Sequence, residues 1–147
     1  MRIVAAAALA VLLGCSTSVE GPPRPAEPEP SAAPGFYSVV QADRGREAFR
    51  GVCSECHSTS DFRGDDFEWQ WRRQTVWDFY RKVTRTMPEE DPGSLSDQVY
   101  TDVIAYILRI NDYASGNAEL VASRQAMDLI PMGPGAVKTR IQDGGER

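Results

Sequence analysis

The sequence predicts an all-α fold, and three observations support that class. No stretch alternates apolar and polar residues with the period of two that is typical of a half-buried strand. Apolar residues instead recur three and four positions apart in separate segments, as they do on one face of an α-helix. The third observation is length, because 147 residues leave room for one domain of this kind and little more.

The N-terminal part of the chain is not expected to join that domain. A short apolar run follows the positive charge of Arg2 and ends at Leu13, too short to span a bilayer and typical of a secretory signal peptide. It continues into Gly14-Cys15, and this ending resembles the lipobox of bacterial lipoproteins. The resemblance implies a signal peptide over residues 1–14, cleavage before Cys15, and acylation of the Cys15 thiol and the new amino terminus. An ordinary signal peptide with a stray cysteine is the alternative.

Residues 15–35 contain Cys15 and a proline-rich stretch from Gly21 to Pro30. This segment has too little apolar surface to form a core and favours extended polyproline geometry. We interpret it as a tether that lets a lipid-anchored domain move between partners, or as a spacer that only keeps the anchor accessible to processing enzymes. Several acyl chains would hold the protein stably on the periplasmic side of the inner or outer membrane.

The folded domain is expected over residues 36–120 and begins with a helix over 41–52. A polar segment over 58–73 follows, for which no helix is predicted. A second helix is predicted over 75–85, where apolar residues repeat at helical intervals.

Met87-Pro88 ends the second helix, because the residue before a proline is pushed out of helical geometry. A third helix is predicted over 97–111 and is apolar on two faces, so both faces must be buried. Beyond it the helical pattern fades. Residues 121–147 are expected to form a weakly structured tail, with 118–129 able to form one short helix.

The clearest chemistry lies in Cys53-Ser54-Glu55-Cys56-His57, because a Cys-x-x-Cys-His run is the attachment signature of a c-type haem. Residues three and four apart share a helical face, so two thiols and an imidazole can converge on one flat group. A redox Cys-x-x-Cys or half a zinc site are the alternatives. A zinc site needs two further ligands, and His57 is the only histidine of the chain. No βαβ pattern favours a thioredoxin-like site.

With His57 on one side of the iron, the residue on the other side decides the function. The candidates are Met87, Met127, Met132, Lys82 and Lys138, or no residue at all. Met87 is favoured because it follows one helix and precedes another, in an extended segment set by Pro88. A thioether ligand would raise the reduction potential and, together with His57, fill both axial positions, which suits the passage of one electron. The other interpretation of Met87 is a gap-filling core residue.

From residue 41 to about residue 120 the chain resembles a class I monohaem cytochrome c. More narrowly, it is similar to the cytochrome domains that serve quinoprotein (PQQ-dependent) alcohol dehydrogenases. The matching pieces are Arg44-Gly45 with Phe49, the Cys53 to His57 motif, Phe67 with Trp71, Thr86-Met87-Pro88, Pro92 to Ser96, Tyr100, and Asp102 to Leu108.

This resemblance implies a small helical domain wrapped around one covalently bound haem c. Cys53 and Cys56 would carry the haem, with His57 and Met87 as axial ligands. It also implies that the first helix crosses the last one, with Gly45 and Phe49 near Val103 and Tyr106.

The chain also departs from that family. The segment between His57 and Phe67 is short and lacks the usual Pro-Leu stretch on the histidine side, which implies a more exposed haem. Trp69, Trp71 and Arg72 either donate to the haem propionates or only cover the shortened loop.

A net charge of −5 and a pI near 4.9 argue against a nucleic-acid partner. The acidic run over residues 89–91 either meets a basic partner or is a solvated loop. We expect an electron carrier rather than an enzyme, working between redox proteins such as a PQQ-dependent dehydrogenase and a terminal oxidase. The alternatives are a haem enzyme or gas sensor with an open sixth position, and a cytochrome subunit of a larger oxidoreductase complex.

Overall fold

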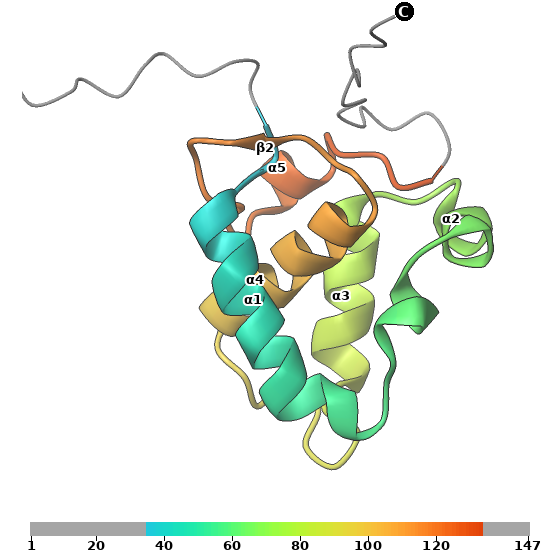
Figure 1. Ribbon diagram of the computed structural model, residues 1–147, viewed down its shortest axis with the longest axis vertical. Helices are drawn as coiled ribbons and strands as arrows, with labels where there is room; N and C mark the ends of the chain where they lie inside the picture. The colour runs from blue at the N-terminus through green and yellow to red at the C-terminus, as the bar shows by residue number, and fades with distance from the viewer. Residues whose placement is uncertain (1–34, 134–147) are drawn as a thin grey trace, which may run out of the picture.

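The computed structural model describes residues 35–133, which form a small helical domain (Figure 1). Two short 3-10 helices, labelled η, join the α-helices. The elements in chain order are β1 (Tyr37–Ser38), α1 (Val39–Val52), η1 (Cys53–Glu55), η2 (Thr59–Phe62), α2 (Asp65–Trp71), α3 (Val76–Thr86), α4 (Asp97–Ile110), β2 (Ser115–Gly116) and α5 (Arg124–Met127). The all-α class is confirmed. The predicted signal peptide, Cys15 and almost all of the tether lie outside the described residues.

Each long helix begins at a hydroxyl side chain. The oxygens of Ser38, Thr75 and Ser96 each accept a backbone N–H from the first turn of α1, α3 and α4. In α3 the Asp78 carboxylate also accepts the backbone N–H of Thr75 at 3.1 Å, and this bond holds the pKa of Asp78 below its usual value. The three predicted helices are confirmed to within two residues at each end.

The main contact between helices joins α1 to α4, and Gly45 makes it possible. A Cβ on Gly45 would lie 1.7 Å from the carbonyl oxygen of Asp102, so no side chain fits at this crossing. One turn further, the rings of Phe49 and Tyr106 pack with centroids 5.6 Å apart. The Arg44 guanidinium also donates to both carboxylate oxygens of Asp102, at 2.9 and 2.8 Å. The predicted crossing of these helices is confirmed.

The helix α2 lies in the polar segment for which no helix is expected. Its inner face carries Phe67 and Trp71, which are 6% and 7% exposed, while its first turn is acidic. Acidic side chains at this end interact favourably with the helix dipole. The i, i+4 spacing of Phe67 and Trp71 is the signal in the sequence that indicates this helix.

The prediction of a weakly structured tail is wrong for residues 121–133. Met127, Ile130 and Met132 are each less than 5% exposed, and the backbone of this segment bonds to the start of α3. The N–H of Val76 donates to the Ile130 carbonyl, and the N–H of Met132 donates to the Gln74 carbonyl, both at 2.9 Å. These apolar side chains are scattered along an irregular segment, so no helical stripe indicates their burial.

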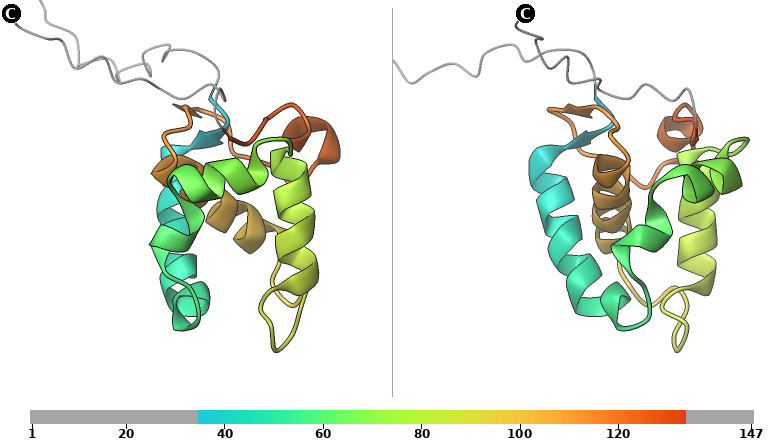
Figure 2. Two further views of the ribbon diagram at one scale, coloured as in Figure 1. Left: turned by 90° about the vertical axis from the view of Figure 1, so that its right-hand side faces the viewer. Right: turned by 45° about the vertical axis from the view of Figure 1, so that its right-hand side comes forward.

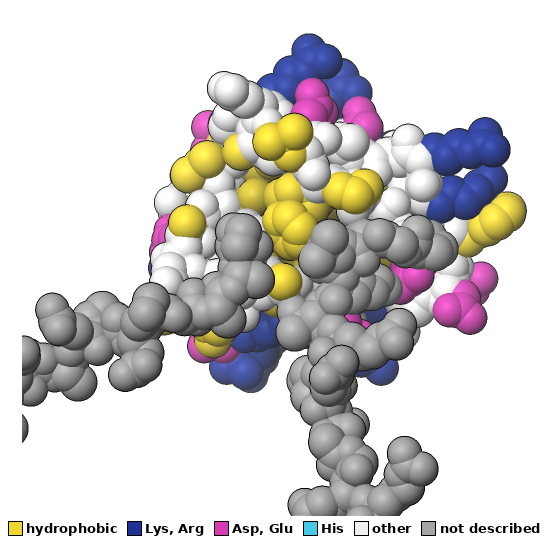
Figure 3. Space-filling view, turned by 90° about the horizontal axis from the view of Figure 1, so that it is seen from above, with side chains coloured by type: hydrophobic (Ala, Val, Ile, Leu, Met, Phe, Trp, Pro, Cys, Tyr) yellow, Lys and Arg dark blue, Asp and Glu magenta, His cyan; other side chains and the backbone are white. Residues whose placement is uncertain are grey.

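The described chain begins and ends at the same end of the domain (Figure 1). There β1 and β2 pair in parallel, with Tyr37 opposite Ser115. Seen from this end, hydrophobic side chains gather near the centre of the face and most Lys and Arg side chains lie at its rim (Figure 3). Figure 2 shows α3 standing apart from α1 and η1, with α4 behind them.

Candidate functional site

A cavity of about 490 Å³ is bordered by the end of α1, residues 53–62, and parts of α2, α3 and α4. Its size lies within the range of cofactor sites, roughly 300–1,000 Å³. Three of its rings pack edge to face, with centroids 5.8 Å apart for Phe67 and Phe79 and 4.8 Å apart for Trp71 and Phe79. The other large apolar residues in the wall are Phe49, Val52, Phe62, Val83, Leu95, Val103 and Ile107.

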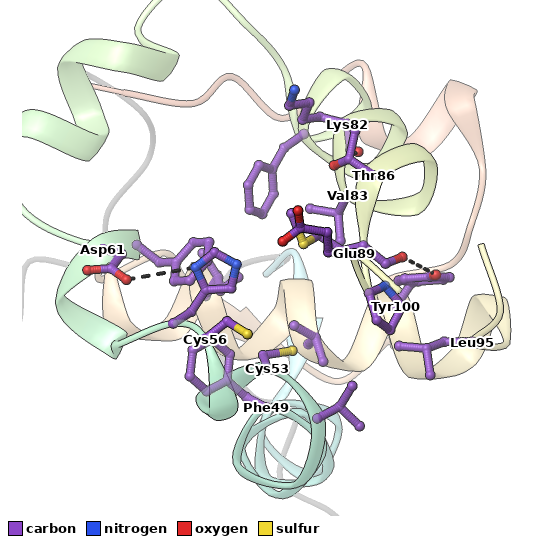
Figure 4. Close-up of a pocket in the computed structure, with 18 of the residues that line it drawn as sticks. Phe49, Cys53, Cys56, Asp61, Lys82, Val83, Thr86, Glu89, Leu95 and Tyr100 are labelled. Atoms are coloured by element: carbon purple, nitrogen blue, oxygen red, sulfur yellow. Dashed lines mark hydrogen bonds and ion pairs between the residues drawn. The ribbon is translucent and has the colours of Figure 1, made fainter. Parts of the chain in front are cut away.

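The Cys-x-x-Cys-His motif forms one border of this cavity. The chain turns there, because the N–H groups of Cys56 and His57 both donate to the carbonyl of Cys53, at 3.2 and 2.9 Å. Figure 4 shows both cysteine side chains at the cavity, each reaching it from η1 or its end. Cys53 is half-buried and burial raises the pKa of its thiol, whereas Cys56 is exposed. The motif therefore brings two thiols and one imidazole to the same cavity.

The imidazole of His57 is one-third exposed and has neighbours from η2. Its ring packs edge-on against Phe62, with centroids 5.2 Å apart. Its Nδ1 lies 3.8 Å from Oδ2 of Asp61 (Figure 4). The side-chain amide of Asn111, at the end of α4, donates to the Phe62 carbonyl at 2.7 Å and so joins this segment to the core.

Met87 lines the same cavity from the end of α3, and its main chain is held by two helices. Its N–H donates to the Val83 carbonyl at 2.8 Å, as the last bond of α3. Its own carbonyl accepts the Tyr100 hydroxyl of α4 at 2.7 Å and the N–H of Gly93 at 3.3 Å. The Met87–Pro88 peptide bond is cis.

The structure places some candidates for the second axial ligand at the cavity and others away from it. Met87 and Lys82 line the cavity. Met127 and Met132 are buried elsewhere and are not among the lining residues. Lys138 lies outside the described residues. The geometry therefore leaves Met87, and after it Lys82, as candidates in residues 35–133.

The structure also distinguishes between the two interpretations of Trp69, Trp71 and Arg72, as donors to the haem propionates or as a cover for the shortened loop. Trp69 is 65% exposed, and the Arg72 guanidinium stacks on its ring at 3.5 Å from the centroid. Arg72 also donates to the Trp69 carbonyl at 2.6 Å, and neither residue lines the cavity. Trp71 does line it. Of the three, only Trp71 stays a candidate donor to haem propionates.

Two site residues have roles that the sequence does not predict. Tyr100 and Asn111 hold the main chain on opposite borders of the cavity, through Met87 and Phe62. Both bonds join residues far apart in the chain. Tyr100 is among the residues that resemble the cytochrome c family, but no local signal in the sequence reveals its bond to Met87.

The residues present fit a haem c. Two thiols and an imidazole come from one segment, a thioether comes from another, and aromatic side chains line the space between them. In a c-type haem two cysteine sulfurs are joined to the porphyrin as thioethers, and an imidazole and a methionine thioether are the iron ligands of a cytochrome c. Among residues 35–133, no group of three or more His, Cys, Asp or Glu side chains is placed to hold a metal ion.

Fold and site together define a small cytochrome c-like helical domain with a haem-sized cavity. Residues 40–107, a little under half of the chain, match the family model described as cytochrome c oxidase, cbb3-type, subunit III. This match supports a class I c-type cytochrome, whose function is haem-based electron transfer. No curated protein and no solved structure gives a match.

Proposed function

We propose that the chain is a lipid-anchored c-type cytochrome that carries single electrons on the periplasmic side of a bacterial membrane. It would work between a dehydrogenase and a respiratory acceptor. The observation that carries the proposal is the convergence of Cys53, Cys56, His57 and Met87 on one cavity. A bound haem c supplies a one-electron iron couple there.

The residues of the chain have separate tasks in this proposal. Cys53 and Cys56 would hold the haem through thioethers, and His57 and Met87 would be the iron ligands. A thioether ligand would favour the reduced iron, and aromatic side chains of the wall would pack against the haem. With both axial positions filled by side chains, the site suits electron transfer rather than the binding of oxygen.

The attachment is tested by changing Cys53 and Cys56 to serine in the chain matured in a bacterial periplasm. We expect no haem to stay with the denatured variant, whereas the wild type keeps one. Ser54→Ala is the matched control, because Ser54 lies inside the motif and its hydroxyl only donates to the Arg50 carbonyl. Covalent haem in the double variant would contradict the proposal.

The carrier role is tested by adding carbon monoxide to the reduced wild-type protein. A filled sixth position predicts slow or weak binding. Fast, stoichiometric binding would instead favour the haem enzyme or gas sensor.

A second candidate, a cytochrome subunit of a larger oxidoreductase complex, is favoured by the matching family, which is that of an oxidase subunit. Extraction of native membranes with a mild detergent discriminates between the two functions. Co-purification with oxidase or dehydrogenase subunits would support the complex, and recovery of the cytochrome alone would support a mobile carrier.

The anchor and the donor are proposals from the sequence. No helix within residues 35–133 is long and apolar enough to cross a membrane. Cys15→Ser should abolish incorporation of labelled palmitate and release the protein from the membrane fraction. A PQQ-dependent alcohol dehydrogenase with its substrate should reduce the wild-type cytochrome, which tests the proposed donor.

A further inference from the structure

The Asp61 carboxylate lies beside Nδ1 of His57. A histidine that ligates iron through one ring nitrogen usually donates a hydrogen bond from the other, and this second bond fixes the ring and makes it more basic. Nδ1 of His57 lies 3.8 Å from Oδ2 of Asp61. Nε2 lies on the far edge of the ring from Nδ1, so an imidazole that faces Asp61 through Nδ1 keeps Nε2 for a ligand.

The position of Asp61 is set by the main chain next to His57. Its Oδ2 accepts the backbone N–H of Ser58 at 2.8 Å, while the Ser58 side chain caps the same short helix. The oxygen that faces the imidazole is therefore the one fixed by the residue that follows His57. A fixed acceptor so close to the ring loses little conformational entropy when the contact forms.

The distance of 3.8 Å is about 1 Å longer than a charge-assisted hydrogen bond. A hydrogen bond between the two groups therefore requires the imidazole and the carboxylate to move closer by that amount. Phe62 packs edge-on against the ring and limits how far it can turn.

We propose that Asp61 is a positioning residue for His57. Its carboxylate accepts the Nδ1–H, selects Nε2 as the atom that meets the iron, and places a negative charge beside the ligand. Negative charge there stabilises the oxidised, more positive centre and lowers its midpoint potential. The inference rests on the proposed function, because it requires haem held by His57. Since the Asp61 side chain is 51% exposed, salt should weaken the charge effect.

The first test compares Asp61→Asn with Glu55→Gln in the matured protein. Asparagine keeps an oxygen to accept the Ser58 N–H but removes the charge. Glu55 also lines the cavity, so Glu55→Gln makes the same change of charge away from Nδ1. We expect Asp61→Asn to raise the midpoint potential clearly more than Glu55→Gln, and the difference to shrink with added salt. Equal shifts in the two variants would overturn the proposal.

The second test observes the imidazole directly, because His57 is the only histidine of the chain. Nitrogen-15 labelling of histidine gives one imidazole in the spectrum of the reduced protein. We expect an Nδ1–H signal that exchanges slowly with water, in the wild type and in Glu55→Gln. Fast exchange of this proton would overturn the role of Asp61 while the haem spectrum still supports the proposed function. Wild-type protein without covalent haem would overturn both.

Discussion

The cavity has a histidine side, residues 53–62, and a methionine side, residues 83–100, and the two are held by different means. On the histidine side most bonds join residues no more than four apart, such as the N–H of His57 and the Cys53 carbonyl. On the methionine side the Met87 carbonyl accepts the Tyr100 hydroxyl from another helix. The N–H of His57 is thus bonded within its own motif, whereas the main chain of Met87 is also bonded to a second helix. The long-range bond of the histidine side, from Asn111, reaches Phe62 rather than the ligand residue. We therefore expect substitutions that weaken the packing between helices to displace Met87 before they displace His57.

The largest effect is expected where both sides depend on one contact, the crossing of α1 and α4. Gly45→Ala would place a Cβ 1.7 Å from the backbone oxygen of Asp102, so one helix must move. Overpacking of a core costs about 1–3 kcal/mol, and a clash with backbone should lie at or above that range. Denaturant unfolding followed by circular dichroism measures the loss. A stable Gly45→Ala protein with unchanged unfolding would contradict this crossing.

Gly51→Ala is the matched control for Gly45→Ala. Gly51 lies in the same helix, and a Cβ there meets no atom within 4 Å. Alanine has the higher helix propensity, so this variant should be unchanged or more stable by about 0.5–1 kcal/mol.

The next substitution, at Met87, distinguishes the methionine side of the cavity from the histidine side. Met87→Ala should leave the haem attached to the histidine side, lower the midpoint potential, and allow carbon monoxide to bind quickly, because the thioether is lost. Met127→Leu is the control: it conserves the volume of a buried methionine outside the cavity, and should leave the potential unchanged.

An unchanged potential in Met87→Ala would contradict methionine ligation. Lys82 is then the side chain to examine, because it also lines the cavity. Adding Lys82→Gln to Met87→Ala would show whether the amine has taken the sixth position.

The difference between the two sides also explains how much the sequence could predict. The cysteines and the histidine follow from a short motif whose geometry is local. Met87 follows from one further local rule, since Pro88 ends a helix and leaves the residue before it extended. The helices α1, α3 and α4 follow from apolar spacing and hydroxyl caps.

The remaining features depend on contacts between distant parts of the chain. The roles of Tyr100 and Asn111 arise from bonds to carbonyl groups 13 and 49 residues away. The packing of residues 121–133 depends on backbone bonds to Gln74 and Val76, which no side-chain pattern records. The helix α2 is short and mostly polar, so its one apolar pair gives a weak signal.

A smaller effect is expected from Tyr100→Phe, which removes the hydroxyl that holds Met87. The Met87 carbonyl keeps its bond from Gly93, so the loss should be about 0.5–1.5 kcal/mol. Tyr106→Phe is the control, because Tyr106 is also in the core of α4 but makes no hydroxyl bond within residues 35–133. Only Tyr100→Phe should weaken the absorption band of methionine-ligated ferric haem. If the two variants behave alike, the hydroxyl of Tyr100 does not hold Met87 in place.

The last effect is confined to alkaline pH and to the bond that joins α3 to the start of α4. The Tyr80 hydroxyl donates to Oδ1 of Asp97 at 2.7 Å. Burial, and after it the bond to Asp97, raises the pKa of Tyr80 from 10.0 to about 12. The stability that Tyr80 contributes is therefore complete below pH 10 and is lost as the pH rises toward 12, because the unfolded chain releases its proton first.

Tyr80→Phe removes this titration, so the difference in free energy of unfolding between wild type and variant should shrink from pH 10 to 12. Burial also raises the pKa values of Tyr37 and Tyr113, but both residues are present in the two proteins and their contributions cancel. Denaturant unfolding at a series of pH values measures the difference. Because the bond belongs to the methionine side, the ligand band of Met87 should weaken over the same pH range in the wild type, before covalent attachment on the histidine side is affected. Parallel pH curves for the two proteins would show that the pKa of Tyr80 is the same in the folded and the unfolded chain.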